Sequence, residues 1–195
     1  MIDPRHITGL VLAGGRGSRM GGVDKGLQVH LGMPLAMHAL LRLAPQVGDV
    51  MINANQNLDR YHALGHPVFA DTVGGFAGPL AGLHAGLAHA TREIVVTVPC
   101  DSPFLALDLV DRLHAALVAD DAQLAVAKTF DQPHPVFALV RRDVLRSLAA
   151  FLERGGRKID AWYAHLDVVE VPFDDEADAF RNINTADELA AAAKA

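Results

Sequence analysis

Apolar runs alternate with helix-like segments along almost the whole chain, and this alternation constrains the fold more than any other feature of the sequence. The run Ile94-Val95-Val96-Thr97-Val98 is almost entirely apolar, as is typical of strands that helices cover on both faces. We expect strands near 7–13, 49–54, 67–70, 94–98, 123–128, 135–140 and 166–171. We expect helices near 34–44, 57–64, 79–90, 106–118, 142–153 and 185–194, with a short helical piece at 159–164. The pattern predicts an α/β fold with a doubly wound, mostly parallel sheet and helices on both faces.

The charge and the cysteine content exclude several classes of protein. A formal net charge of -6 and a pI near 5.9 leave no overall basic field that could hold a nucleic acid. Cys100 is the only cysteine, which excludes an internal disulfide and suits a reducing compartment. The first residues lack the pattern of a signal peptide, and no apolar run reaches bilayer length. We therefore expect a soluble, cytoplasmic protein that binds neither nucleic acid nor membrane.

The segment from Leu12 to Lys25 follows the first expected strand and combines five glycines with two arginines and a lysine. Glycines allow backbone N–H groups to approach a ligand closely, and Arg16, Arg19 and Lys25 supply positive charge. This combination predicts a cradle for a polyanion such as a triphosphate. The segment is not a P-loop, because Lys25 is followed by a glycine, and it also lacks the spacing of the dinucleotide-binding fingerprint. A flexible surface loop is the alternative interpretation.

Polar residues follow further expected strands, at the edge where parallel sheets bind their ligands. Asp101 follows an apolar strand and lies between two prolines, so its carboxylate is held at a fixed point. One carboxylate beside a triphosphate suffices for Mg²⁺, because water and phosphate oxygens complete the octahedron. The alternative role for Asp101 is the N-cap of the next helix. Asn53 and Asp71 could hydrogen-bond a base or a ribose, or they could serve only their turns.

The C-terminal region contains two smaller signals. Thr185 and Glu188 have the spacing of a capping box, which is a structural feature. Asn182 lies outside that box and is therefore available to the metal or to a second substrate. Arg157 and Lys158 follow two glycines and form either a second cationic patch or a solvated helix end.

Four motifs, in this order and at this chain length, resemble those of the molybdenum cofactor guanylyltransferases, a family in the sugar-nucleotidyltransferase-like group. They are Leu12-Ala13-Gly14-Gly15 with Arg19-Met20-Gly21 and Lys25, Gly78-Pro79-Leu80-Ala81-Gly82, Pro99-Cys100-Asp101-Ser102-Pro103, and Asn182 with Asn184-Thr185. The resemblance covers most of the chain and implies a Rossmann-like nucleotidyltransferase fold. It implies transfer of GMP from GTP, with Mg²⁺, to molybdenum-loaded molybdopterin, with release of pyrophosphate.

The resemblance also implies a set of site residues, divided among the nucleotide, the metal and the second substrate. The implied GTP-binding residues are Leu12, Ala13, Gly14, Gly15, Lys25, Asn53, Asp71 and Asp101. The implied catalytic residues are Arg19, Lys25 and Asp101, and Asp101 is also the implied Mg²⁺ ligand. Asn182 and Asn184 would face the molybdopterin.

We expect one domain over 1–195, with a nucleotide-binding part at about 1–105 and a second-substrate part at about 106–195. The resemblance implies GTP and molybdopterin as ligands, and other cofactor-biosynthesis proteins and molybdoenzyme chaperones as partners. Three alternatives stay open: a molybdopterin cytidylyltransferase, a sugar-1-phosphate nucleotidyltransferase, and a nucleotide-binding module without catalysis. The pair Gly14-Gly15 favours guanine by family analogy, and the presence of Lys25 and Asp101 argues against a role limited to binding.

Overall fold

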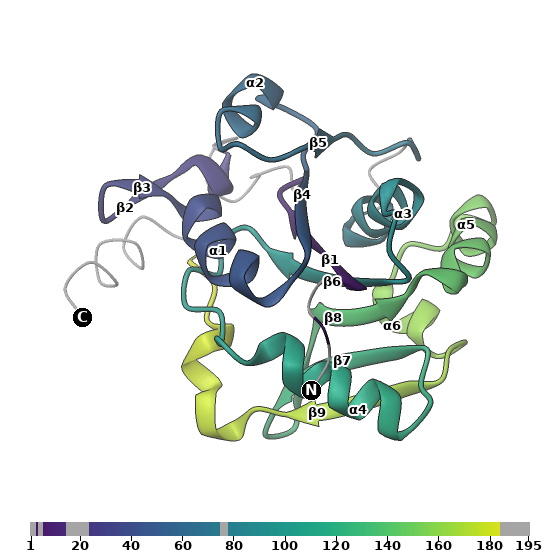
Figure 1. Ribbon diagram of the computed structural model, residues 1–195. Helices are drawn as coiled ribbons and strands as arrows, with labels where there is room; N and C mark the ends of the chain where they lie inside the picture. The colour runs from purple at the N-terminus through teal and green to yellow at the C-terminus, as the bar shows by residue number, and fades with distance from the viewer. Residues whose placement is uncertain (1–2, 4–5, 15–23, 75–77, 184–195) are drawn as a thin grey trace.

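A seven-stranded sheet forms the centre of the protein (Figure 1). The computed structural model describes residues 3, 6–14, 24–74 and 78–183. The strands of the sheet are β1 (Ile7–Leu12), β4 (Asp49–Asn53), β5 (Val68–Phe69), β6 (Ile94–Pro99), β7 (Leu124–Thr129), β8 (Gln132–Arg141) and β9 (Val168–Pro172). They lie in the order β5-β4-β1-β6-β8-β7-β9. Neighbouring strands in this sheet are parallel except where β8 pairs with β6 and β7, so the mostly parallel sheet predicted from the sequence is confirmed.

Helices cover both faces of this sheet (Figure 1). They are α1 (Leu35–Leu43), α2 (Leu58–His62), α3 (Pro79–His89), α4 (Leu109–Ala119), α5 (Leu145–Glu153) and α6 (Ile159–Tyr163). Successive residues of a strand point to opposite faces, so Val11 shares a buried cluster with α1 and α4, while Leu10 shares another with α3 and α5. The doubly wound arrangement is therefore confirmed. Within the described part of the chain, no helix is both long and apolar enough to cross a membrane.

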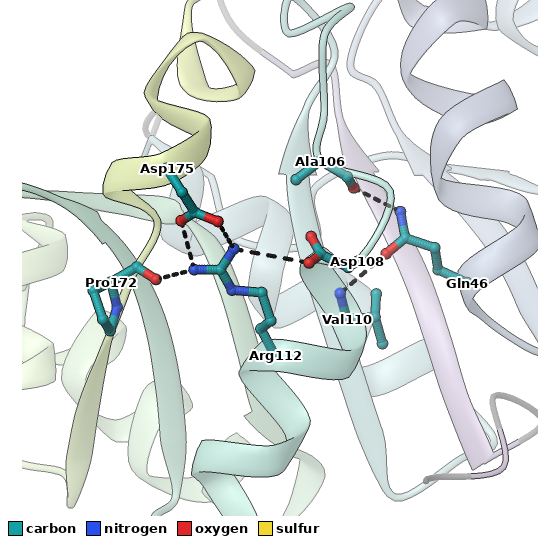
Figure 2. A network of polar contacts seen from close by, with 7 residues as sticks. All are labelled: Gln46, Ala106, Asp108, Val110, Arg112, Pro172 and Asp175. Atoms are coloured by element: carbon teal, nitrogen blue, oxygen red, sulfur yellow. Dashed lines mark hydrogen bonds and ion pairs between the residues drawn. The ribbon is translucent and has the colours of Figure 1, made fainter.

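Most helices and strands begin and end within three residues of their predicted limits. The helix α4 begins three residues later than predicted, and its contacts explain this difference. The predicted start was residue 106, but Gln46 Nε2 donates to the Ala106 carbonyl at 2.9 Å and Arg42 Nε donates to the Leu105 carbonyl at 2.7 Å. Gln46 Oε1 then accepts the Val110 N–H at 3.0 Å and caps the helix (Figure 2). Contacts with α1 and the turn after it thus set the beginning of α4. The helix predicted at 185–194 lies outside the described residues.

A small hairpin, β2 (Val29–His30) with β3 (Met33–Pro34), was not predicted. Two-residue strands are too short to show a period in the sequence. The turn between them places Leu31 at φ 47° and Gly32 at φ 86°, the left-handed conformations that a two-residue hairpin turn requires.

Arg112 of α4 ties the edge strand β9 to the body of the protein (Figure 2). Its guanidinium donates to both carboxylate oxygens of Asp175 at 3.0 Å and also to the Pro172 carbonyl. The same group lies 3.9 Å from the centre of the Phe173 ring. These hydrogen bonds hold the pKa of Asp175 below its ordinary value. They also fix the 3-10 helix Asp174–Phe180, which leads toward Asn182.

The strand order reverses direction between β1 and β6. From β1 the chain runs through α1 to β4 and β5 on one side, and it returns through α3 to β6 on the other side of β1. In open α/β sheets, ligands bind at the carboxyl ends of the strands at such a switch point. The residues that follow β1, β4, β5 and β6 are therefore the ones to examine for a functional site.

Candidate active site

Lys25 and Asp101 meet at the carboxyl ends of β1 and β6. Lys25 begins a short 3-10 helix, Lys25–Leu27, and Asp101 lies in the turn that follows β6. The Lys25 Nζ lies 3.4 Å from the Asp101 Oδ2, although the two residues are 76 positions apart in the sequence. The fold thus brings the lysine from the end of the glycine-rich segment against the carboxylate predicted to hold a metal.

Burial dominates the electrostatics of Asp101, whose side chain is 11% exposed. It raises the pKa of Asp101 above 3.8, and the positive charge and hydrogen bond of Lys25 offset only part of this rise. The ionised carboxylate is therefore poorly solvated, and a further cation beside it would stabilise it. Among the residues that the structure describes, no three or more His, Cys, Asp or Glu side chains cluster as a metal site. A single carboxylate is enough to hold Mg²⁺, which takes water and phosphate oxygens as its further ligands.

Asp71, after β5, is held by two asparagines from the end of β4. Asn53 Nδ2 donates to Asp71 Oδ1 at 2.9 Å, and Asn55 Nδ2 donates to Asp71 Oδ2 at 2.8 Å. The Asp71 backbone N–H donates to Asn55 Oδ1 at 2.8 Å. Asn53 is buried, whereas Asp71 is half-buried. The carboxylate is thus fixed in orientation, and its remaining lone pairs can still accept hydrogen bonds from a ligand.

Gly14 lies against this pair of asparagines with no room for a side chain. A Cβ at Gly14 would lie 2.8 Å from Asn55 Nδ2 and 2.9 Å from Asn53 Oδ1, and a Cβ at Gly82 of α3 would overlap Asn53 Oδ1. The Ala13 N–H donates to the Asn53 carbonyl at 2.8 Å. Leu12, which is half-buried, ends β1, and its carbonyl accepts the N–H of Cys100, directly after β6, at 3.1 Å. Residues 12–14 therefore form a backbone surface beside Asn53 and Asp71.

Asn182 lies on the Asp101 side of the site. Ser102 Oγ donates to Asn182 Oδ1 at 2.5 Å. The Ile183 N–H donates to the Asp101 carbonyl at 2.9 Å. The C-terminal segment is thus bound to the turn after β6, which brings Asn182 close to the residues predicted for the nucleotide and the metal.

Other predicted features either fall on residues that the structure does not describe or make contacts of a different kind. Gly15, Arg19 and Asn184, like the capping box at 185–188, lie outside the described residues. Arg157 Nη1 donates to the Leu152 carbonyl at 3.0 Å, at the end of α5. That contact favours the helix-end interpretation of the Arg157 patch over a second anion site.

Four contributors to this region were not predicted from the sequence: Asp24, Asn55, Asn57 and Tyr61. Asp24 is buried, accepts from Tyr61 Oη at 2.5 Å and accepts from Asn57 Nδ2 at 3.0 Å. The available signals were the second asparagine of Asn53-Ala54-Asn55 and the position of Asp24 directly before Lys25, whereas nothing in the sequence indicated that Asn57 and Tyr61 contact Asp24.

The comparison with known families defines the class of this protein. Residues 9–168 match the family model of the MobA-like NTP transferase domain. This range includes β1, β4, β5 and β6, with the lysine–carboxylate pair at their carboxyl ends. The protein is a nucleotidyltransferase.

Relatives of known sequence define the family more narrowly. The molybdenum cofactor guanylyltransferase of Bordetella petrii is 57% identical over 193 residues, which cover 97% of this chain and 98% of that protein. The enzyme of the same name from Cupriavidus metallidurans is 56% identical over 194 residues, with coverage of 97% and 95%. The chain belongs to the molybdenum cofactor guanylyltransferase family.

Solved structures agree with the fold. The molybdopterin-guanine dinucleotide biosynthesis protein A of Archaeoglobus fulgidus superposes with a TM-score of 0.79 at 26% identity, covering 96% of this chain and 97% of that one. The 4-diphosphocytidyl-2C-methyl-D-erythritol synthase of Anaerococcus prevotii superposes with a TM-score of 0.71 at 11% identity, covering 98% of each chain. The second likeness shows a shared fold alone.

Proposed function

We propose that this protein transfers GMP from GTP to the terminal phosphate of molybdenum-loaded molybdopterin and releases pyrophosphate. One observation carries the proposal: Lys25 and the buried Asp101 face each other at the switch point of the sheet, directly after the glycine-rich segment. Relatives named molybdenum cofactor guanylyltransferase, at 56–57% identity over almost the whole chain, support the choice of nucleotide and acceptor.

Asp71 and Asn53 would recognise the guanosine. Guanine presents an N–H and an amino group side by side, and a fixed carboxylate is the natural acceptor for such a pair of donors. The two asparagines that hold Asp71 give its carboxylate one orientation. Leu12, Ala13, Gly14 and Gly15 would form the backbone wall under the nucleotide, with Gly14 close enough to Asn53 to exclude any side chain.

The cationic groups would act on the triphosphate. The terminal phosphate of molybdopterin must attack the α-phosphorus of GTP, and both phosphate groups carry negative charge. The protein must therefore neutralise this charge and align the two groups. Lys25 would neutralise phosphate charge, and Arg19 would add a second cation. Asp101 would hold Mg²⁺, which supplies further charge neutralisation on the phosphates when bound.

The second substrate would lie on the C-terminal side, near Asn182 and Asn184. Asn182 is bound to Ser102, one residue after the proposed metal ligand. We assign the nucleotide to the part before about residue 105 and the molybdopterin to the part after it. We further propose a cytoplasmic location, in keeping with the free Cys100 thiol, and exchange of the cofactor with other biosynthetic proteins and molybdoenzyme chaperones.

The proposal is tested by measuring pyrophosphate release with Mg²⁺ and molybdenum-loaded molybdopterin, with GTP or CTP as the nucleotide and a control without molybdopterin. We expect release only when both GTP and molybdopterin are present. Release with CTP in place of GTP would instead indicate a cytidylyltransferase. No release with either nucleotide would favour a sugar-phosphate acceptor or a binding protein.

Variants at two lysines connect the activity to the site. Lys25→Ala should lower the rate by about a hundredfold or more, because a preorganised charge on the triphosphate is lost. Lys128→Ala removes a lysine paired with Glu170 at 2.9 Å on the strands β7 and β9, and it should leave the rate unchanged. Equal rates in the two variants would contradict the role of Lys25.

A further inference from the structure

We infer that Tyr61 and Asn57 are positioning residues that hold Lys25 opposite Asp101 by binding the buried carboxylate of Asp24. The inference rests on the proposed function, in which Lys25 meets the triphosphate. Asp24 directly precedes Lys25 and is only 7% exposed. Tyr61 Oη donates to Asp24 Oδ1 at 2.5 Å, and Asn57 Nδ2 donates to Asp24 Oδ2 at 3.0 Å. Both carboxylate oxygens are thus bound by donors from one segment, and we call these three residues the Asp24 clamp.

The residue on the other side of Lys25 is fixed as well. A Cβ at Gly26 would lie 2.5 Å from Tyr61 Oη and 3.0 Å from Cys100 Sγ, so the Gly26 backbone packs directly on both groups. Tyr61 is completely buried, and Cys100 directly precedes Asp101. The Tyr61 hydroxyl therefore touches the chain both before and after Lys25. The backbone next to Lys25 therefore packs against Cys100, in the same turn after β6 that carries Asp101.

The clamp also connects the two halves of the proposed nucleotide site. Asn53 and Asn55, at the start of the segment 53–61, bind Asp71 on the guanosine side. Asn57 and Tyr61, at its end, bind Asp24 on the phosphate side. One short segment thus sets the distance between the groups proposed for the base and those proposed for the phosphates.

This arrangement matters because a lysine side chain is long and flexible. A charge contributes to catalysis when it is held in place before the reaction begins. A displacement of about 1 Å can cost up to about a hundredfold in rate. The Asp24 clamp holds the backbone on both sides of Lys25, and this fixes the position from which the lysine side chain extends.

The first test is Tyr61→Phe, which removes one hydroxyl and keeps the ring. We expect kcat to fall about tenfold. The matched control is Tyr163→Phe, because Tyr163 is the other tyrosine and its hydroxyl donates to the Pro135 carbonyl at 2.6 Å. The control should lose comparable thermal stability and keep kcat within about twofold, because its hydroxyl bonds to Pro135 and not to Asp24.

The second test is a double-mutant cycle with Lys25→Ala, read out as the affinity for GTP and for guanosine by calorimetry. This readout does not depend on transfer. Tyr61→Phe should weaken GTP binding about fivefold in the wild-type background, should change it less than about twofold in the Lys25→Ala background, and should leave guanosine binding unchanged. A structural defect would instead act equally in both backgrounds. Asn57→Gly, which tolerates the left-handed φ of 52°, should repeat the result if Tyr61→Phe does not fold.

The outcomes separate the two proposals. Equal weakening in both backgrounds, equal weakening for guanosine, or an unchanged kcat in Tyr61→Phe would overturn the positioning role. A wild-type protein that binds GTP but releases no pyrophosphate would overturn the proposed transfer reaction. In that case the GTP-affinity cycle still decides whether the clamp positions Lys25.

Discussion

Replacing Asp101 with Asn should separate activity from stability. The two side chains have the same shape, but the amide carries no charge and is a weaker metal ligand. The Asp101 carboxylate lies 3.4 Å from the Lys25 ammonium, and these two side chains are 11% and 23% exposed. The substitution therefore removes one charge of a partly buried ion pair without opening a cavity.

The expected change in the free energy of unfolding is small because two large effects oppose each other. Two unit charges at 3.4 Å attract by about 5 kcal/mol at an effective dielectric constant of about 20. Removing a carboxylate from water costs several kcal/mol, and burial raises the pKa of Asp101 although Lys25 lowers it. After the substitution, Lys25 can still be hydrated at its exposed part. We expect the free energy of unfolding at neutral pH to change by no more than about 1 kcal/mol, or about 2–4 °C in Tm.

The pH dependence of this difference follows from the direction of the pKa shift. The folded protein binds a proton at Asp101 more tightly than the unfolded chain does, whose aspartates titrate near 3.8. Ionisation of Asp101 therefore lowers the stability of the wild type as the pH rises above that value. Asp101→Asn has no carboxylate to ionise. Its free energy of unfolding relative to the wild type should therefore increase as the pH rises from 3.8 toward the raised pKa of Asp101.

The expected change in activity is large, about a hundredfold to a thousandfold in pyrophosphate release at limiting Mg²⁺. The assay compares initial rates over a range of Mg²⁺ concentrations and measures urea unfolding of the same samples. A variant destabilised by more than about 3 kcal/mol would show that the pair with Lys25 is structural. A variant with near wild-type turnover at limiting Mg²⁺ would refute the assignment of Asp101 as the metal ligand.

Two further predictions concern stability. Gly26→Ala should lower the free energy of unfolding by about 1–3 kcal/mol in urea titrations, because the new Cβ would lie 2.5 Å from Tyr61 Oη. Gly74→Ala is its control, since nothing lies within 4 Å of a Cβ there. Burial and the nearby His38 lower the pKa of His30 below 6.5, so the unfolded chain binds the proton more tightly and wild-type stability should fall as the pH drops below about 6.5. His30→Gln should make this fall shallower in urea titrations across that pH range.

Each of these predictions has a clear contrary outcome. If Gly26→Ala were as stable as Gly74→Ala, the contact between Gly26 and Tyr61 would not limit the packing. If wild type and His30→Gln lost stability equally as the pH fell, other groups would account for the whole effect. His114 and His134 also have lowered pKa values, and they contribute equally to both proteins.

Residues adjacent to predicted strands were easier to anticipate than contacts between elements. Asn53, Asp71 and Asp101 each follow an apolar run, and the carboxyl ends of parallel strands share one edge. Their proximity could therefore be predicted. The antiparallel direction of β8 could not be predicted. Its predicted start at residue 135 left a longer gap after β7, whereas the structure has a two-residue connection in which Phe130 has φ 51°.

The sequence by itself determined the alternation of strands and helices, and with it the doubly wound sheet and the edge that carries the polar residues. Hydrophobic periodicity and local turn chemistry are properties of neighbouring residues, so they can be read along the chain. Only the tertiary structure decided the strand order and the pairs Lys25–Asp101 and Asp24–Tyr61, whose members are 76 and 37 residues apart. Such pairs depend on strand register and on where each helix packs, because side chains far apart in sequence meet only when every intervening element has its place.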